Sequence, residues 1–251
     1  MSLSEPQRQR YDRNLQVPEI GEAGQEKLLS SRVLVVGAGG LGGPVLYYLT
    51  ALGVGKIGIV DSDKLEISNL QRQILYTEED VGKNKVFAAV ERLKSLNSGV
   101  EFEAHNTRFN RDSAARIMAA GNYDLLVDAV DNYRTRLLLN KLALEYRMPL
   151  VHGAVYRFEG QASTFLPDRG PCYRCLYPDL DQEDCMEAPG PASMVPGLIG
   201  IIQVGEVTRL LLGEEPVLFG ELFCVDLFEL DFNRLEISRD IDCEVCASRK
   251  N

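Results

Sequence analysis

The sequence is poor in histidine, in positive charge and in long apolar runs. Its two histidines, His105 and His152, are too few and too far apart to form a histidine metal cluster. The net charge of −10 argues against a protein that coats nucleic acid or binds an anionic membrane. The most apolar run, 197–212, is interrupted by polar residues and is too short to span a bilayer. We therefore expect this run to be a core helix.

The N-terminus lacks the apolar core of a signal peptide, because residues 4–13 are polar and rich in arginine. With 251 residues, of which 45% are hydrophobic and 25% charged, the composition is that of a soluble globular protein. These features predict a cytoplasmic protein with no membrane and no nucleic-acid partner. We treat residues 1–251 as one domain.

A glycine-rich turn follows the first apolar segment. Residues 33–36 read Val-Leu-Val-Val, which predicts a short buried strand, and they lead into Gly37-x-Gly39-x-x-Gly42 and a helical pattern over 41–52. A strand, a glycine turn and a helix N-terminus together form an anion site, because the backbone can approach a phosphate and the free helix amides point at it. Asp61 ends the next predicted strand, 19 residues after Gly42, where such folds place an acid that binds ribose. The motif predicts nucleotide binding.

The glycine motif by itself favours a dinucleotide-binding oxidoreductase over other nucleotide-binding proteins. It is not a P-loop, because the Lys-Ser/Thr ending is absent. Triphosphate chemistry needs cations and a carboxylate for magnesium. Arg72 lies in the loop after the Asp61 strand, and Lys83 and Lys85 start the next predicted helix. Asp128 and Asp131 come at the end of the predicted strand 124–130. Each alone is typical of a solvated surface charge, but together they favour ATP.

Strands and helices alternate up to residue 152, which predicts a Rossmann-like, doubly wound and mostly parallel α/β sheet. After Gly153 the pattern changes to antiparallel-style strands over 160–166 and 217–237, for example in the alternation from Phe228 to Phe232. We therefore predict a mixed sheet. Its domain divides into N-terminal helices (1–31), a nucleotide-binding part (32–152) and a C-terminal part (153–251).

Four of the six cysteines form two Cys-x-x-Cys pairs. Four thiolates satisfy the tetrahedral preference of zinc, so Cys172, Cys175, Cys243 and Cys246 predict a structural zinc site that staples the C-terminus. The alternative is a redox-active pair, for which one pair would suffice. Cys185 lies in an acidic stretch and is a candidate reactive thiol, whereas an apolar setting places Cys224 in the core.

These motifs occur together in one known family. The chain resembles the ThiF/MoeB/HesA family of ubiquitin-activating-type adenylyltransferases over roughly residues 8–248. The resemblance is carried by Arg10-Tyr11-x-Arg13, the 37–42 loop, Asp61-x-Asp63, the string Ser68-Asn-Leu-Gln-Arg-Gln73, Lys85, Asp128-x-x-Asp131-Asn132 and the two cysteine pairs.

The resemblance implies an activity. A ubiquitin-like sulfur-carrier protein of the ThiS or MoaD type would present its C-terminal Gly-Gly carboxylate to the α-phosphate of ATP. Pyrophosphate would leave in a step of sulfur transfer for thiamin or molybdenum-cofactor synthesis. The nucleotide-binding residues that it implies are Gly37, Gly39, Gly40, Gly42, Asp61, Asp63, Asn69, Arg72, Gln73, Lys85, Asp131 and Asn132.

The resemblance also implies catalytic roles. Asp131 would bind magnesium as the essential acid, and Arg72 and Lys85 would hold the phosphates. Arg13 would reach the triphosphate of the partner subunit, which implies a homodimer. Cys185 would be a candidate for sulfur transfer. Any persulfide is expected from a separate sulfurtransferase, because no such domain follows Cys246.

The chain departs from the common family pattern at a few positions. Asn14, Ala129 and Ser98 replace a usual glutamine, cysteine and proline, and the segment 189–196 is unusually rich in proline. None of these changes removes a catalytic group. Three alternatives are kept: a family member that activates a tRNA base or a peptide, an NAD-dependent oxidoreductase, and a zinc-stapled scaffold without catalytic activity.

Overall fold

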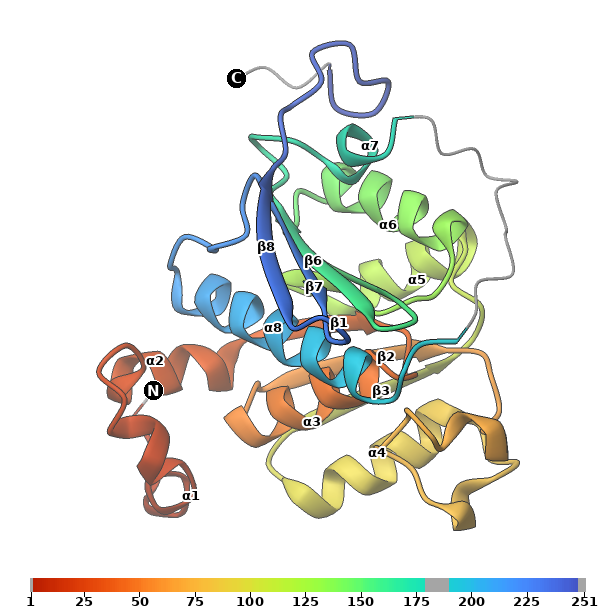
Figure 1. Ribbon diagram of the computed structural model, residues 1–251. Coiled ribbons are helices and arrows are strands. Elements are labelled where there is room, and N and C mark those ends of the chain that lie inside the picture. Colours follow the sequence, from red (N-terminus) through yellow and green to blue (C-terminus); the bar gives the residue numbers. More distant parts are fainter. Residues whose placement is uncertain (1, 179–189, 248–251) are drawn as a thin grey trace.

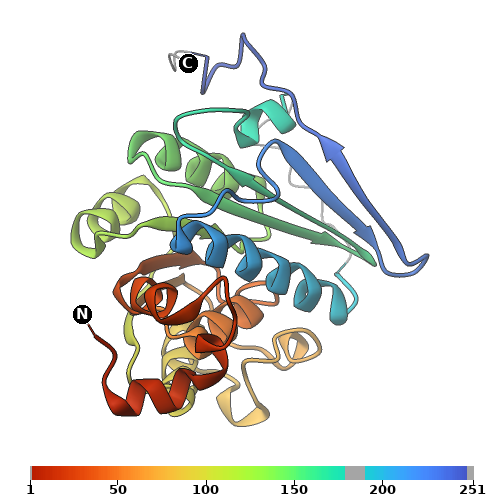
Figure 2. The same ribbon diagram turned by 90° about the vertical axis from the view of Figure 1, so that its left-hand side faces the viewer.

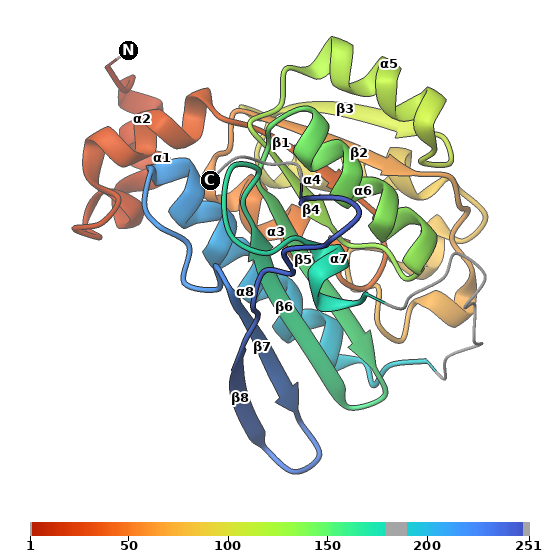
Figure 3. The same ribbon diagram turned by 90° about the horizontal axis from the view of Figure 1, so that it is seen from above.

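The computed structural model describes residues 2–178 and 190–247. A single eight-stranded sheet runs through the molecule (Figure 1), in the order β3-β2-β1-β4-β5-β6-β7-β8 (Figure 3). Its strands are β1 (Arg32–Val36), β2 (Lys56–Asp61), β3 (Glu101–Asn106), β4 (Leu125–Asp128), β5 (Leu150–Tyr156), β6 (Glu159–Phe165), β7 (Glu221–Asp226) and β8 (Asp231–Glu236).

The helices alternate with the first five strands, and the last two helices lie between β6 and β7. They are α1 (Glu5–Leu15), α2 (Gly21–Ser30), α3 (Gly42–Leu52), α4 (Lys85–Leu96), α5 (Arg111–Gly121), α6 (Tyr133–Glu145), α7 (Tyr173–Leu176) and α8 (Met194–Leu212), with short 3-10 turns η1 (Ile67–Asn69) and η2 (Glu78–Asp80).

The sheet is mixed, as the sequence predicted. Strands β3, β2, β1, β4 and β5 are parallel, and β6, β7 and β8 add to β5 as antiparallel neighbours. The chain order reverses between β1 and β4, and open α/β sheets bind ligands at such a switch point, beyond the carboxyl ends of the strands. The predicted fold class is confirmed, and the sheet places the glycine turn at this point.

Alternation along the buried strands builds two cores. Val33 and Val35 of β1 pack into the layer that contains α3, α4 and α8, while Leu34 and Val36 pack against α5 and α6. Successive side chains of a strand point to opposite faces, so an uninterrupted apolar run covers both. Figure 1 shows the two helical layers on opposite sides of the sheet.

Helix α8 is the predicted core helix, although it begins at Met194 and not at residue 197. It is long and apolar enough to cross a membrane by composition, but half of its apolar window is buried inside the protein. It packs against α3, β5 and β6. Its buried Glu206 accepts hydrogen bonds from Thr164 Oγ1 and from the amides of Val217 and Leu218. Its polar groups therefore serve the core of a folded domain.

Three local predictions are corrected. The alternation from Phe228 to Phe232 is strand only at its end, because residues 227–230 form the turn between β7 and β8, with Leu230 at φ 56°, and Phe232 lies in β8. The predicted strand 124–130 is shorter, since β4 ends at Asp128. Lys83 lies in the turn before α4, which begins at Lys85. Alternation cannot separate a strand from a tight hairpin turn that carries exposed apolar side chains.

Helices α1 and α2 lie apart from the C-terminal loop, at the other side of the molecule (Figures 1 and 2). Tyr11 of α1 is buried against Gly53, at the end of α3. Its hydroxyl accepts a hydrogen bond of 3.0 Å from Asn97 Nδ2. Helix α3 begins at Gly42 beside the glycine turn and ends just before Gly53, and its 11 residues span about 16 Å. The contacts of Tyr11 therefore hold α1 at the end of α3 that is remote from the glycine turn.

Candidate nucleotide and metal sites

The glycine turn connects β1 to α3 with no room for side chains at two positions. Gly37 has φ +100°, and a Cβ there would collide with the carbonyl of Ala129. A Cβ at Gly42 would collide with the carbonyl of Gly37. Gly39 and Gly40 have more space: a Cβ there would lie 3.4 Å from Gln73 Nε2 and 3.4 Å from Arg72 Cγ, respectively. The turn therefore packs closely against its own backbone at Gly42 and against the Ala129 backbone at Gly37. Two predicted site residues, Arg72 and Gln73, border it.

Asp61 at the end of β2 is bound to this loop. One carboxylate oxygen accepts the Ala38 amide at 2.9 Å, and the other accepts the Asp63 amide at 2.9 Å. Burial raises the pKa of Asp61, and the charge of Lys85 and the two amide donors oppose that rise. A carboxylate held in this way keeps lone pairs free for hydroxyl donors, as a ribose-binding acid requires.

Lys85 is brought to the same edge by the loop between β2 and α4. Its Nζ lies 3.0 Å from Asp63 Oδ2, and its side chain is 7% exposed whereas that of Asp63 is 65% exposed. The Lys85 amide donates to the Asp63 carbonyl at 3.0 Å. The cation is therefore already positioned, and its partner faces solvent.

Tyr76 was not predicted, yet it links two parts of this site. Its buried hydroxyl donates to the carbonyl of Ala38 at 2.7 Å and lies 3.4 Å from the carbonyl of Lys85. Burial raises the pKa of Tyr76, so the phenol stays a donor. The sequence signal was a lone tyrosine in a polar loop, which does not indicate such a contact.

Asn69 and Arg72 lie in the same loop, at and just after the short turn η1. Asn69 Oδ1 accepts the amide of Glu66 at 3.2 Å, which fixes the turn. Arg72 is partly exposed, with Nη1 3.4 Å from the carbonyl of Ser68. These bonds orient the loop so that Arg72 borders Gly40.

The two aspartates predicted at the end of β4 lie in different environments. Asp128 is fully buried, with Oδ2 2.7 Å from His152 Nδ1 and Oδ1 accepting the Val130 amide at 3.2 Å. Asp131 is exposed. Asn132 caps α6 by accepting the Thr135 amide at 3.0 Å. Asp128 therefore shapes the turn, and Asp131 is the carboxylate available to solvent.

Arg13 does not reach the glycine turn of its own chain. It lies on α1, beyond the far end of α3, and its side chain is 88% exposed. Its guanidinium contacts Asp12 and Gln16 of the same helix. A role at a triphosphate would thus require a second subunit.

The four predicted zinc ligands converge, with all four sulfurs within 4.8 Å of one another. The separations are 3.9 Å between Cys172 and Cys175, 3.8 Å between Cys172 and Cys243, and 3.4 Å between Cys175 and Cys246. A tetrahedral zinc with bonds of about 2.3 Å places sulfurs about 3.8 Å apart. The cluster fits the metal, and we call residues 172–176 and 240–247 the knuckle.

The other two cysteines are not in the cluster. Cys224 on β7 is half-buried, and burial raises the pKa of its thiol, so the predicted core position is met in part. Cys185, the candidate for sulfur transfer, lies outside the described residues.

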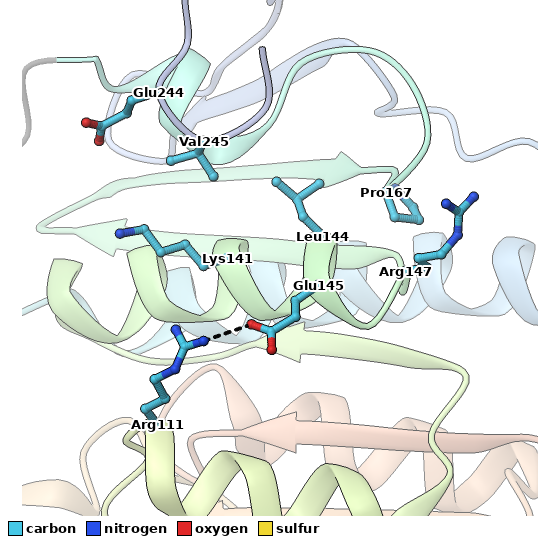
Figure 4. Close-up of a pocket in the computed structure, with 8 residues that line it drawn as sticks. All are labelled: Arg111, Lys141, Leu144, Glu145, Arg147, Pro167, Glu244 and Val245. Carbon is cyan, nitrogen blue, oxygen red and sulfur yellow. Dashed lines mark hydrogen bonds and ion pairs between the residues drawn. The ribbon is translucent and has the colours of Figure 1, made fainter. Parts of the chain in front are cut away.

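A cavity of about 550 Å³ lies between α5, α6 and the knuckle. Figure 4 shows Lys141, Leu144 and Glu145 of α6 facing it, with Arg111 of α5 paired to Glu145 at 3.3 Å. None of the predicted nucleotide-binding residues lines it. The glycine turn and Asp61, by contrast, lie at the carboxyl ends of β1 and β2.

Asp80 fastens the loop that carries the predicted phosphate ligands. Its carboxylate is 8% exposed, pairs with Lys83 at 2.9 Å and Arg92 at 3.3 Å, and caps η2 at Thr77. Burial opposes ionisation, but these partners lower the pKa of Asp80 to about 2. Asp80→Asn should cost up to about 2 kcal/mol near neutral pH.

This stabilisation is present above the ordinary pKa of an aspartate and is lost as pH falls toward the folded value. The stability gap between wild type and Asp80→Asn should therefore narrow as pH falls from about 5 toward about 2 in urea titrations. The exposed neighbour Glu78→Gln serves as the control, with little expected change. A gap that does not vary with pH would contradict the assignment.

The chain is similar to known proteins over nearly its whole length. The model of the ThiF family matches residues 11–245. A SAMP-activating enzyme E1 of Haloferax volcanii is 43% identical over 250 residues, covering 98% of this chain and 91% of the relative. A sulfur carrier protein adenylyltransferase of Thermus thermophilus is 44% identical over 246 residues, covering 94% and 90%. The crystal structure of E. coli MccB with MccA-N7isoASN superposes with a TM-score of 0.83 at 22% identity, over 98% of this chain and 76% of that one, which shows a shared fold.

Proposed function

Because the chain belongs to the ThiF family, we propose that it uses ATP to adenylylate the C-terminal Gly-Gly carboxylate of a ubiquitin-like sulfur-carrier protein. The observation that carries this proposal is the identity of more than two-fifths with a sulfur carrier protein adenylyltransferase over nearly the full length of both chains. The position of Lys85, Arg72 and Asp131 around the switch point supports it. We assign the enzyme to the cytoplasm.

The step joins two anions, so charge must be offset before reaction. The triphosphate lies on the glycine turn and the N-terminus of α3, with Asp61 at the ribose and Asn69, Gln73 and Asn132 beside it. Arg72 and Lys85 bind phosphate oxygens. Asp131 would hold magnesium, which would neutralise phosphate charge. A carboxylate oxygen of the carrier attacks the α-phosphorus, the bond to the bridging oxygen breaks, and pyrophosphate leaves with that electron pair.

Pyrophosphate exchange into ATP tests this function. Exchange is expected with a carrier that ends in Gly-Gly and is expected to vanish when that dipeptide is deleted. Pyrophosphate exchange that persists after the deletion would refute the proposal. Binding of a nicotinamide cofactor in competition with ATP would favour the oxidoreductase alternative. Assaying ThiS-type and MoaD-type carriers side by side identifies the pathway that the enzyme serves.

The C-terminal part, 153–251, is proposed to bind the carrier. Its hairpins expose a set of apolar side chains that we call the hairpin patch: Phe158, Phe228, Leu230, Phe232 and Leu235, between 37% and 72% exposed. The rings of Phe158 and Phe228 lie 5.3 Å apart and join the two hairpin tips. The β7–β8 hairpin extends away from the rest of the sheet (Figure 3).

The hairpin patch is linked to the nucleotide site by the segment before α8. The Ala192 amide donates to the Arg157 carbonyl at 2.8 Å, beside Phe158. Four residues later, Pro196 lies beside Gly40, where a Cβ would be 3.2 Å from its ring. A carrier seated on the patch could thus extend its tail along this segment to the glycine turn.

Phe232→Asp is expected to raise the KM for the carrier about 10-fold or more, because a charge replaces an aromatic side chain that the bound carrier would cover. The affinity for ATP should not change. Initial exchange rates at varied carrier and at varied ATP separate the two effects. Leu96→Asp, an exposed apolar residue on α4, is the control. An unchanged carrier KM in Phe232→Asp would exclude the hairpin patch.

The placement of Arg13 leads us to propose a homodimer in which each Arg13 completes the other subunit's site. Arg13→Ala and Lys85→Ala should each be inactive alone. Mixed after denaturation and refolding, they should recover about one quarter of wild-type activity, since half the dimers carry one intact site. If Arg13 acted within its own chain, no mixed dimer would have an intact site and activity would stay absent.

We assign the four-cysteine cluster to zinc, with Cys172, Cys175, Cys243 and Cys246 as ligands. Four thiolates leave no open position, so the metal would supply a structural cross-link. A separate sulfurtransferase is proposed to deliver sulfur to the adenylylated carrier, with Cys185 as a candidate acceptor on this chain.

A further inference from the structure

Helix α6 buries two polar side chains on one side. Arg136 is 7% exposed and Asn140 is 1% exposed, and they are separated by four residues, which is about one helical turn. Polar groups at such positions are costly unless each finds a partner. The partners of Arg136 lie in the turn before Asp131, and those of Asn140 lie in the knuckle. Helix α6 therefore connects these two sites.

The Arg136 end holds the turn that carries Asp131. Arg136 Nη2 donates to the Val130 carbonyl at 2.7 Å, and its Nε lies 3.7 Å from Asp128 Oδ2. Asp128 in turn accepts the Val130 amide. Val130, the residue before Asp131, is therefore held through both its amide and its carbonyl.

The Asn140 end holds the knuckle. Asn140 Nδ2 lies 3.5 Å from Cys172 Sγ, and Asn140 Oδ1 accepts the Tyr173 amide at 3.0 Å. The side-chain amide of Asn140 thus donates to the sulfur of Cys172 and accepts from the backbone amide of Tyr173, the next residue.

A second route closes these contacts into a ring. The side chain of Tyr173 packs edge-on against the His152 ring, with centroids 4.9 Å apart, and His152 Nδ1 lies 2.7 Å from Asp128. Burial lowers the pKa of His152, so the imidazole stays neutral and donates from Nδ1 to the carboxylate. The ring runs from Asp128 through Arg136, Asn140, Tyr173 and His152 back to Asp128.

We propose that Asn140 is a positioning residue that makes the geometry of the Asp131 turn depend on the metal state of the knuckle. Hydrogen bonds to ligating groups orient them and tune metal affinity. When the thiolates are held by metal, the Cys172–Asn140 bond fixes α6, and Arg136 transmits that position to Val130. The coupling to Asp131 rests on the proposed function, because magnesium binding by Asp131 is part of it.

Asn140→Asp tests the knuckle half of the proposal. The carboxylate keeps the acceptor for the Tyr173 amide but replaces the donor to Cys172 by an oxygen. Zinc affinity, measured by competition with a chromophoric chelator, should fall 10- to 100-fold. The cobalt-substituted protein should show a shifted thiolate-to-metal absorption band. An unchanged affinity and an unchanged band would overturn the role of Asn140.

The matched control for zinc affinity is Asn97→Asp. Asn97 is also 1% exposed, donates to Thr50 and Tyr11, and accepts the Gly99 amide at 3.2 Å. The same exchange there keeps one acceptor and removes the donors, far from the knuckle. It should leave zinc affinity unchanged. An equal fall in both variants would assign the effect to general destabilisation and refute the proposal.

The coupling half is tested at saturating zinc. In Asn140→Asp the magnesium concentration for half-maximal exchange should rise several-fold, while ATP binding without magnesium stays as in wild type. A normal magnesium dependence would overturn the coupling even if zinc binding weakened. If the wild type shows no pyrophosphate exchange, the proposed function is refuted, whereas the result on zinc affinity remains valid.

Hydrogen exchange of the wild type gives a readout that needs no variant. Removal of zinc should speed amide exchange in the peptide that covers 128–132, including the Val130 amide. The β2 peptide, 56–61, lies outside the ring and should keep its protection. Unaltered exchange over 128–132 would contradict the coupling.

Discussion

Asp131→Ala is expected to lower pyrophosphate exchange at least about 100-fold while the fold is retained. Removal of one group that stabilises developing charge typically costs that much, and a lost metal ligand adds to it. The side chain is exposed after β4, so its removal leaves no core cavity. Exchange kinetics at varied magnesium, together with thermal unfolding, give both quantities.

The control is Asp112→Ala, an exposed aspartate in the first turn of α5, which should keep wild-type exchange. Near-normal exchange in Asp131→Ala would show that another carboxylate holds the metal. Asp128 is not a candidate for that role, because it is fully buried and both its oxygens lie against His152 and Val130.

The core of the fold was accessible from the sequence because it depends on local patterns. Apolar runs gave the parallel strands, and the glycine spacing identified the turn after β1. The same reasoning failed at residues 228–230, where the exposed Phe228 and Leu230 of a hairpin turn imitate strand alternation. The order of residues alone does not show whether an apolar side chain is exposed or buried, so the pattern of a strand and that of this turn look the same.

The candidate site was predictable in its residue types but not in its support. Glycines, cations and cysteine pairs have known chemistry at fixed spacings. Tyr76, Asn140 and His152 act through partners that lie far away in sequence, so no local pattern indicates them. Arg136 donates to a nearby backbone carbonyl, which carries no sequence signal. The residue pattern, without the family resemblance, also treated Asp128 and Asp131 alike, whereas the structure separates a buried carboxylate from an exposed one.

Cys246→Ser is expected to release zinc and to lower the melting temperature by roughly 10 °C or more. A structural zinc contributes its binding free energy directly to folding, and several kcal/mol lost from a domain of this size produce a shift of that order. Cys246 is fully buried in the knuckle and comes from the chain's end, whereas Cys172 and Cys175 lie between β6 and α8. Without the metal, residues 240–247 lose their cross-link to that region. Zinc analysis and calorimetry measure the two effects.

The outcome has a matched control within the chain. Cys224→Ser changes a half-buried cysteine outside the cluster, so it should retain about one zinc per chain and unfold within a few degrees of wild type. A strong chelator should reproduce the Cys246→Ser shift in the wild type and add little to the variant, because the same cross-link is lost in both. Freshly reduced protein that carries two disulfides and no zinc would refute the staple, since the sulfur separations of 3.4–3.9 Å would then close to covalent bonds.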